Sequence, residues 1–161
     1  MYVLRRLSDE LSIYKNLRNA EFIKKSSHRY SVVVGVGGNM GDVKRRMQKL
    51  YIFLNRDKRV AVEKISSILK NPPFGYVYQE FFYNSVMVVR TNMQPLKFLD
   101  YLLRVEKRFL RKRSFKDAPR TLDLDIIFFE DRKVAHQRLT IPHSGYASRD
   151  SVMIPLCEIK R

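Results

Sequence analysis

The 161-residue sequence predicts an α+β fold, because β-branched segments of strand length alternate with two amphipathic helical segments. Hydrophobic residues make up 45% of the chain, enough for one full core. We therefore expect one main domain over residues 30–161. Over residues 1–29, Leu7, Leu11 and Tyr14 recur at spacings of three and four, which predicts an N-terminal helical extension.

The elements of the main domain follow one another in a recognisable order. They are a strand from Tyr30, a helix from Val43, strands over 60–69 and 83–91, a helix from Pro95 and a strand over 121–129. Proline is well suited to the first turn of a helix, and the glycines of residues 35–41 end the first strand in a turn. This order is that of a split βαβ, or ferredoxin-like, βαββαβ sandwich. We expect the helices on one face of the sheet and an open face for a site.

Composition restricts the partners and the compartment. The chain has 32 Lys and Arg against 16 Asp and Glu, a net charge of +16, which indicates nucleic acid, a smaller polyanion such as ATP, or simply a basic surface. The single cysteine, Cys157, excludes an internal disulfide framework and fits a cytoplasmic protein. No apolar run reaches the roughly 18 residues that span a bilayer, so we expect no membrane partner. The oligomeric state stays open, with a monomer slightly favoured.

Two aspartates in the last predicted strand are the clearest sign of chemistry. Strand side chains alternate between faces, so Asp123 and Asp125 should share one face about 7 Å apart. The other face, which should point into the core, carries Leu122, Leu124, Ile126 and Phe128. Neighbouring carboxylates repel each other, which favours bound divalent cations, and two Mg²⁺ ions would suit phosphoryl chemistry. The alternative is that both aspartates lie on the solvent side of an amphipathic strand.

A basic loop precedes this strand. Its cations are Arg111, Lys112, Arg113, Lys116 and Arg120. Arginine binds phosphate oxygens through several planar donors, so the loop could hold a polyphosphate, or it could be an exposed basic loop without a ligand.

The glycine-rich turn and one histidine are weaker signs. Residues 35–41 match neither the dinucleotide-binding nor the Walker template, and we interpret them as a tight turn over the site, with Asn39 available to a ligand. His143, beside Pro142, is a candidate ligand contact, although a lone histidine is more often structural.

Four segments in order resemble the 6-hydroxymethyl-7,8-dihydropterin pyrophosphokinase family of folate biosynthesis. They are residues 36–42, residues 71–75 with 82–84, the block Ala118-Pro-Arg-Thr-Leu-Asp-Leu-Asp-Ile126, and Ile141-Pro-His143 followed by Arg149 and Pro155-Leu156. The resemblance implies a ferredoxin-like fold that transfers the β,γ-pyrophosphate of ATP to the pterin hydroxymethyl group and releases AMP.

The resemblance also implies residue roles. Asp123 and Asp125 would bind two Mg²⁺ ions, and the catalytic phosphate contacts would be Arg111, Arg113 and Arg120. The ATP contacts would be Glu106, Ile126, His143 and Arg149. The pterin contacts would be Asn71, Pro72, Phe74, Phe82 and Asn84. Asp117 and Ser151 stand where the family often has aromatic residues, and Phe115 or Tyr146 are the candidates to replace the missing stacking ring.

Two other interpretations remain. A basic ferredoxin-like sheet is also the architecture of RNA-recognition motifs. We expect no nucleic acid, because the face that would stack bases carries Asp123 and Asp125 and the aromatic-glycine pattern of those motifs is absent. A family member that binds without catalysing transfer is the second interpretation, motivated by Asp117 and Ser151.

Overall fold

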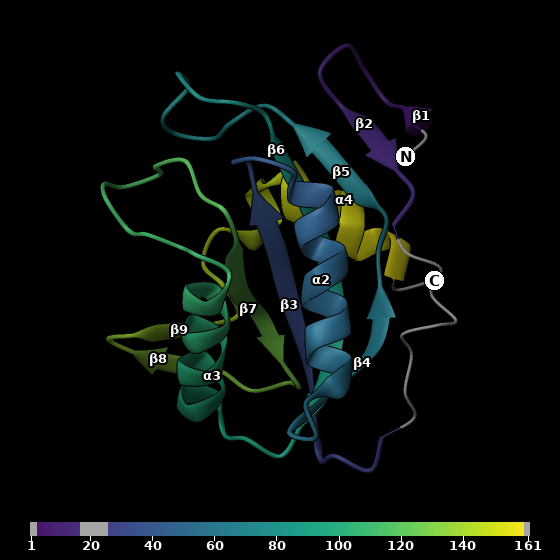
Figure 1. Ribbon diagram of the computed structural model, residues 1–161. Coiled ribbons are helices and arrows are strands. Elements are labelled where there is room, and N and C mark those ends of the chain that lie inside the picture. Colours follow the sequence, from purple (N-terminus) through teal and green to yellow (C-terminus); the bar gives the residue numbers. More distant parts are fainter. Residues whose placement is uncertain (1–2, 17–25, 160–161) are drawn as a thin grey trace.

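The computed structural model describes residues 3–16 and 26–159, and its centre is an antiparallel sheet built around β3 (Tyr30–Gly38) (Figure 1). β3 pairs with β6 (Phe82–Thr91) on one side and with β7 (Asp123–Phe129) on the other. β6 also pairs with β4 (Val60–Ile65) and, nearer its start, with β5 (Ile68–Asn71). The strand predicted over residues 60–69 is thus interrupted at Ser66 and Ser67.

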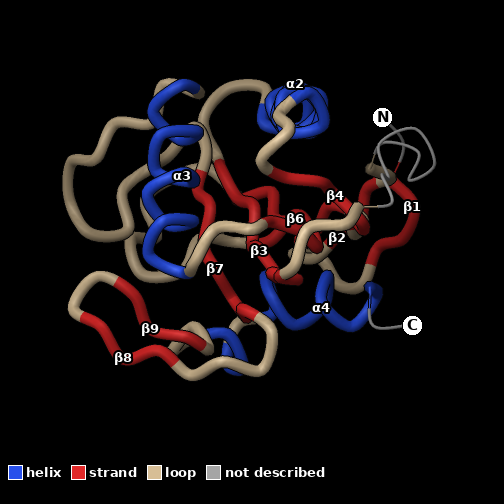
Figure 2. Tube along the Cα trace, turned by 90° about the horizontal axis from the view of Figure 1, so that it is seen from below, coloured by secondary structure: helices blue, strands red, loops and turns tan. Residues whose placement is uncertain are grey.

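Two helices cover one face of this sheet (Figures 1 and 2). α2 (Val43–Arg56) begins after Asp42, whose carboxylate accepts the backbone N–H of Arg45 at 3.0 Å, and α3 (Pro95–Arg108) begins at the proline, as predicted. Both helices turn their apolar faces to the sheet, where Met47 and Phe98 are fully buried. The core therefore lies between these helices and β3, β6 and β7.

The other face of the sheet is only partly open, which corrects the prediction. α4 (Asp150–Ile159) lies across β5 and β6 on the side opposite α2 and α3 (Figure 2). The short 3₁₀ helix Tyr146–Ser148 leads into it, and a small hairpin of β8 (Val134–His136) and β9 (Leu139–Ile141) lies beside β7. Leu156 of α4 is buried, so the helix covers apolar sheet surface that would otherwise face water.

The predicted N-terminal helix is wrong for residues 3–14. β1 (Val3–Arg6) and β2 (Ser12–Tyr14) form an antiparallel hairpin, and β2 pairs with β5, which adds both strands to the sheet (Figure 1). The edge of β5 offers unpaired backbone groups, and a strand satisfies them whereas a helix cannot. The rest of the predicted helix, residues 17–25, lies outside the described residues.

An irregularity in β7 changes which phenylalanine enters the core. Val33 pairs with Phe128 but Val34 pairs with Ile126, so Ile127 is an extra residue in the register. As a result Phe129 is fully buried, and Phe128, expected in the core, packs against Tyr146 with ring centroids 4.8 Å apart. The two aspartates precede the irregularity. Within the described part of the chain, no helix is long and apolar enough to cross a membrane.

Candidate active site

A cavity on the α4 side of the sheet brings distant segments together. It has a volume of about 90 Å³ and is lined by the glycine-rich end of β3, the starts of β6 and β7, the loops before them, and the start of α4. Asp123 and Asp125 both line it, together with Arg120. The prediction that the two carboxylates share one face of the strand is confirmed.

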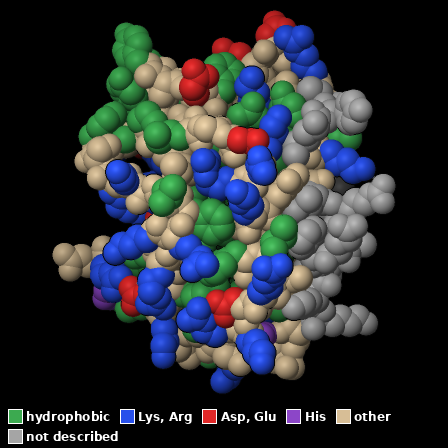
Figure 3. Space-filling model, viewed as in Figure 1, with side chains coloured by type: hydrophobic (Ala, Val, Ile, Leu, Met, Phe, Trp, Pro, Cys, Tyr) green, Lys and Arg blue, Asp and Glu red, His purple; other side chains and the backbone are tan. Residues whose placement is uncertain are grey.

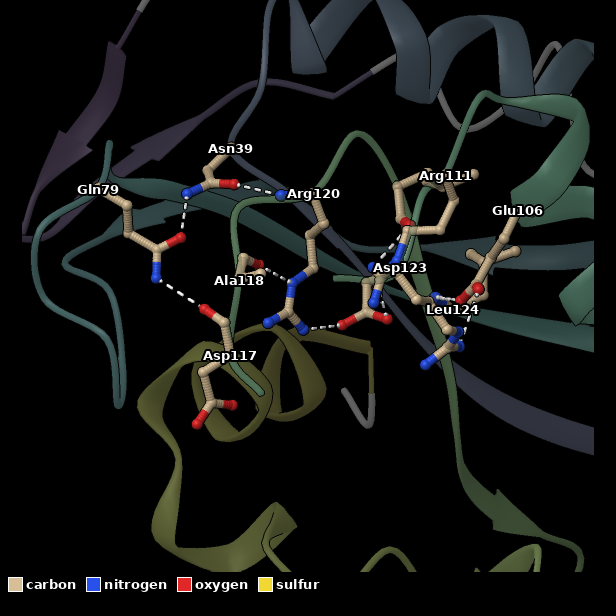
Figure 4. A network of polar contacts seen from close by, with 11 residues as sticks. Asn39, Gln79, Glu106, Arg111, Asp117, Ala118, Arg120, Asp123 and Leu124 are labelled. Atoms are coloured by element: carbon tan, nitrogen blue, oxygen red, sulfur yellow. Dashed lines mark hydrogen bonds and ion pairs between the residues drawn. The ribbon is translucent and has the colours of Figure 1, made fainter. Parts of the chain in front are cut away.

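Asp123 is paired with two arginines from the basic loop (Figure 4). Nη1 of Arg120 lies 2.6 Å from Oδ2, and Nη1 of Arg111 lies 3.1 Å from Oδ1 and donates to the Leu122 carbonyl at 2.9 Å. The Arg111 side chain is only 9% exposed, and its buried Nε has no hydrogen-bond partner among the described residues. Arg111 therefore keeps one buried donor without a partner among the described residues.

Asp125 lies in a strongly repulsive environment. Burial, together with the negative charges of Asp123 and Glu106, raises the pKa of its carboxyl to about 7, and the positive charges of Arg120 and Arg149 offset only part of this rise. A carboxylate so placed is stabilised by a cation. No cluster of three His, Cys, Asp or Glu side chains suited to a metal is found in the described ranges 3–16 and 26–159. Two carboxylates still fit Mg²⁺, which takes its remaining ligands from phosphate oxygens and water.

Glu106 connects α3 to β7 from inside the core. It is 2% exposed; Oε1 accepts the backbone N–H of Leu124 at 2.8 Å, and Oε2 pairs with Nη2 of Arg113 at 3.1 Å (Figure 4). Burial raises the pKa of this carboxyl. Both oxygens of this predicted ATP contact are thus engaged by the protein, and the Arg113 side chain is 65% exposed.

Asn39 joins the three loops around the cavity. Its Oδ1 accepts the backbone N–H of Arg120 at 2.9 Å, while Nδ2 donates to Gln79 Oε1 at 2.8 Å and to the Glu80 carbonyl at 3.0 Å. Gln79 in turn donates to the Asp117 carbonyl at 2.9 Å (Figure 4). Asn39 is buried and its side chain is fully used, so the interpretation that it is available to a ligand is wrong. No sequence signal pointed to Gln79.

Most of the predicted pterin contacts meet in the same cavity. Asn71, Phe74, Phe82 and Asn84 line it, and Nδ2 of Asn84 donates to Oδ1 of Asn71 at 2.7 Å. A Cβ on Gly37 would lie 2.5 Å from Oδ1 of Asn84, so a larger residue at this position would displace the Asn84 amide. Pro72 does not line the cavity; its carbonyl accepts a hydrogen bond from Asn71 Nδ2 at 2.8 Å.

Guanidinium groups cover both phenylalanine rings. Arg120 lies 5.4 Å from the ring centroid of Phe82, and Arg149 lies 5.1 Å from that of Phe74. Ser151 lines the cavity, whereas neither candidate for a replacement ring does. Phe115 packs edge-on against Tyr76, and Tyr146 packs against Phe128.

A second cavity, of about 300 Å³, adjoins the first along β7 and the β8–β9 hairpin. It is lined by Ile126 and His143, and Asp125 lines both cavities. Nδ1 of His143 accepts the Gly145 N–H at 3.2 Å. Burial and the charge of Arg149 lower the pKa of His143, which leaves the ring neutral at pH 7. The predicted ATP contacts are therefore divided: Ile126 and His143 in this cavity, Arg149 in the first, Glu106 in neither.

In this α+β fold, the Asp125 carboxylate lines both cavities, and Arg120 and Arg149 lie near it. This arrangement is that of an enzyme that moves a phosphate-containing group between two ligands. Within this class, a sequence model of the family 7,8-dihydro-6-hydroxymethylpterin-pyrophosphokinase matches residues 33–161. The chain belongs to this family.

Individual relatives agree with the family match. The 2-amino-4-hydroxy-6-hydroxymethyldihydropteridine pyrophosphokinase of Campylobacter jejuni is 38% identical over 130 residues, which cover 81% of this chain and 83% of the relative. The Helicobacter pylori protein of the same name is 36% identical over 137 residues, 84% of each chain. The Synechocystis protein of that name is 38% identical over 130 residues, 81% of this chain and 66% of the relative.

Proposed function

We propose that this protein transfers the β,γ-pyrophosphate of ATP to 6-hydroxymethyl-7,8-dihydropterin in folate biosynthesis, giving the pterin diphosphate and AMP. The pterin hydroxyl oxygen forms a bond to the β-phosphorus as it loses its proton, and the bond from that phosphorus to the oxygen bridging to the α-phosphate breaks. Membership of a pyrophosphokinase family supports this reaction. The observation that carries it is the carboxylate of Asp125 between two differently lined cavities.

The lining of the two cavities supports a division of the substrates. In the first, the amides of Asn71 and Asn84 would bind the polar edge of the pterin, and Phe82 would stack on its ring. The backbone near Pro72 and Phe74 would complete this pocket. The second cavity would hold the nucleoside of ATP. There Ile126 would supply apolar contact, and the neutral ring of His143 could donate through Nε2 to an ATP oxygen.

The charges beside Asp125 support a polyphosphate path between the cavities. Asp123 and Asp125 would hold two Mg²⁺ ions, which when bound would supply positive charge to the phosphate oxygens. Arg111 and Arg120 would then turn from Asp123 to the phosphates, and Arg149 of the first cavity and the exposed Arg113 would add positive charge. Phosphoryl transfer mostly needs alignment and charge neutralisation, which these groups can provide without a covalent nucleophile.

The small first cavity implies movement of its walls. Ligand pockets usually occupy about 300–1,000 Å³, so a cavity of about 90 Å³ must widen to admit a bicyclic ring. Phe74 is 68% exposed on its loop, and Asp117 lies in the basic loop opposite. We propose that these two loops separate to admit the pterin and then close again over both substrates.

The wider setting of the enzyme is also proposed. The antiparallel order β7–β3–β6–β4 supports a ferredoxin-like core. Residues 30–161 would form the catalytic domain and residues 1–29 an extension that adds the β1–β2 hairpin to it. The lone cysteine favours the cytoplasm. We expect a monomer that uses no nucleic acid.

The test is the formation of AMP by the purified protein from ATP and Mg²⁺, with and without 6-hydroxymethyl-7,8-dihydropterin. AMP should appear only with the pterin. Asp123→Ala and Asp125→Ala should each lower the rate by at least roughly 100-fold, since each removes charge stabilisation from the transition state.

The control is Asp131→Ala, which removes an exposed carboxylate outside both cavities and should leave the rate within about twofold. Thermal unfolding of every variant would show that the fold is retained. Release of ADP instead of AMP, or AMP release that does not depend on the pterin, would remove the assignment.

A further inference from the structure

A basic groove lies along α2 and the end of α3, on the face of the sheet opposite the first cavity. Its volume is about 1150 Å³, and seven basic but only two acidic residues line it. The space-filling view of this face shows Lys and Arg side chains gathered over the two helices (Figure 3). None of the substrate contacts proposed above lines the groove.

The positive charge of the groove is not balanced within the described residues. Asp57 is paired with Arg59 at 2.7 Å, which lowers its pKa to about 2, and Asp42 caps α2. Arg45, Lys49 and Arg56 are exposed along one side of α2, and none has a carboxylate partner in the described part of the chain. Such a row of unpaired cations favours an anionic partner.

The floor of the groove distinguishes between kinds of anion. Phe53 is not free to stack on a nucleobase, because Phe109 packs edge-on against it at 6.1 Å and Arg108 lies 4.9 Å from its ring centroid. Aliphatic side chains are available instead: Ile52 is 39% exposed and Leu110 is 76% exposed. A phosphate backbone makes polar and charged contacts and does not pack on these aliphatic side chains, whereas the apolar side chains of a polypeptide can.

We infer that this groove binds an acidic helical segment of another protein. Its carboxylates would face Arg45, Lys49 and Arg56, and its aliphatic side chains would pack on Ile52 and Leu110. A second copy of this chain is a poor candidate, because it also carries a net charge of +16. α2 has 14 residues and is about 21 Å long, so a partner helix of about 14 residues matches it.

The test uses a fluorescent helical peptide of about that length, with Glu on one face and Leu at every third or fourth position. Anisotropy is measured with the full chain at roughly 0.15 M salt, where surface charges are screened beyond about 8 Å. We expect saturable binding. One control peptide has Ser in place of every Leu at the same charge, and a second probe is an oligouridylate of equal charge. Both should bind at least fivefold more weakly.

Matched variants separate the groove from the general charge. R45E/K49E reverses two cations of the groove, and K97E/K133E makes the same change in charge at two exposed lysines outside it. Peptide affinity should fall at least tenfold in the first and less than threefold in the second. Ile52→Ser should weaken the Leu peptide at least threefold without affecting the Ser peptide. Pterin-dependent AMP formation should stay near wild type in all three, which separates this inference from the transferase assignment.

Three results would overturn the inference. The first is no saturable binding of the Leu peptide. The second is equal loss of peptide affinity in R45E/K49E and K97E/K133E, which would mean that net charge alone attracts the peptide. The third is tighter binding of the oligouridylate than of the Leu peptide, lost in R45E/K49E, which would make the groove a nucleic-acid site.

Discussion

The fold disfavours the negative charge of the Asp125 carboxylate. Its carboxyl keeps its proton to about pH 7 in the folded protein, whereas in an unfolded chain it would lose it near 3.8. The folded state therefore binds more protons between these values, and its stability falls as the pH rises from about 4 through 7. A cation at the site would offset this loss, which favours metal binding at neutral pH.

The fall in stability with rising pH gives a prediction for Asp125→Asn. Without Mg²⁺ or ATP, the free energy of unfolding of the wild type should fall by about 2 kcal/mol more between pH 5 and pH 8 than that of the variant. Urea unfolding at the two pH values measures it. The raised pKa of Glu106 is present in both proteins, so the difference isolates Asp125. Equal losses in both proteins would show that this carboxyl titrates normally.

The aspartate pair was predictable because it depends only on local geometry. Alternation along a strand places Asp123 and Asp125 on one face wherever that strand lies. Their partners were not predictable, because these depend on how loops return to the sheet. Glu106 is 18 residues from Leu124, and Asn39 is 40 residues from Gln79. No spacing within one segment encodes such hydrogen bonds.

At the scale of elements, the three loops around the first cavity act as one unit through Asn39. Asn39→Ala would leave the N–H of Arg120 and the carbonyl of Glu80, both in partly buried hydrogen bonds, without this partner, at a cost of about 1 kcal/mol in stability. The loop over residues 76–81 would then open more often. We predict faster amide hydrogen exchange there, with the central strand β3 unchanged.

Asn39→Asp is the matched variant. Its carboxylate still accepts from Arg120 N but cannot donate to Gln79 or Glu80. Exchange in residues 76–81 should rise as in Asn39→Ala, while residues 118–120 stay protected. Unchanged exchange over 76–81 in both variants would show that Asn39 does not hold this loop.

The sequence predicted the helices and strands that have their own apolar periodicity. It did not predict the elements whose structure depends on contact with a neighbouring strand or sheet. α2 and α3 each carry a complete apolar face and begin at a cap or a proline. The sequence of the β1–β2 hairpin has no strand-like alternation of apolar residues, and the spacing of Leu7, Leu11 and Tyr14 fits a helix. The segment forms strands because β2 pairs with the edge of β5. α4 contains Pro155 and is stabilised by the sheet that it covers.

At the scale of the whole molecule, the two faces of the sheet carry different electrostatic functions. On the α4 side, Arg111 and Arg120 pair with Asp123, so these charges neutralise one another. On the α2–α3 side, Arg59 is paired with Asp57, but Arg45, Lys49 and Arg56 have no carboxylate partner among the described residues. These exposed cations of the described residues repel one another.

Salt should accordingly act on stability and on substrate binding in opposite directions. Raising the ionic strength from roughly 0.01 to 0.15 M shortens the Debye length from about 30 to about 8 Å. Self-repulsion then weakens, and without ligands the Tm should rise by a few degrees. The KM for ATP should also rise, because the arginines that attract the polyphosphate are screened as well. The ion pair of Arg111 and Asp123 is largely shielded from solvent, so its strength should change little with salt.

The variant R45E/K49E/K97E/K133E, with eight fewer units of net charge, should show a smaller rise in Tm over the same range. A Tm that falls with salt in the wild type, or rises equally in both proteins, would show that self-repulsion does not limit the stability of this fold.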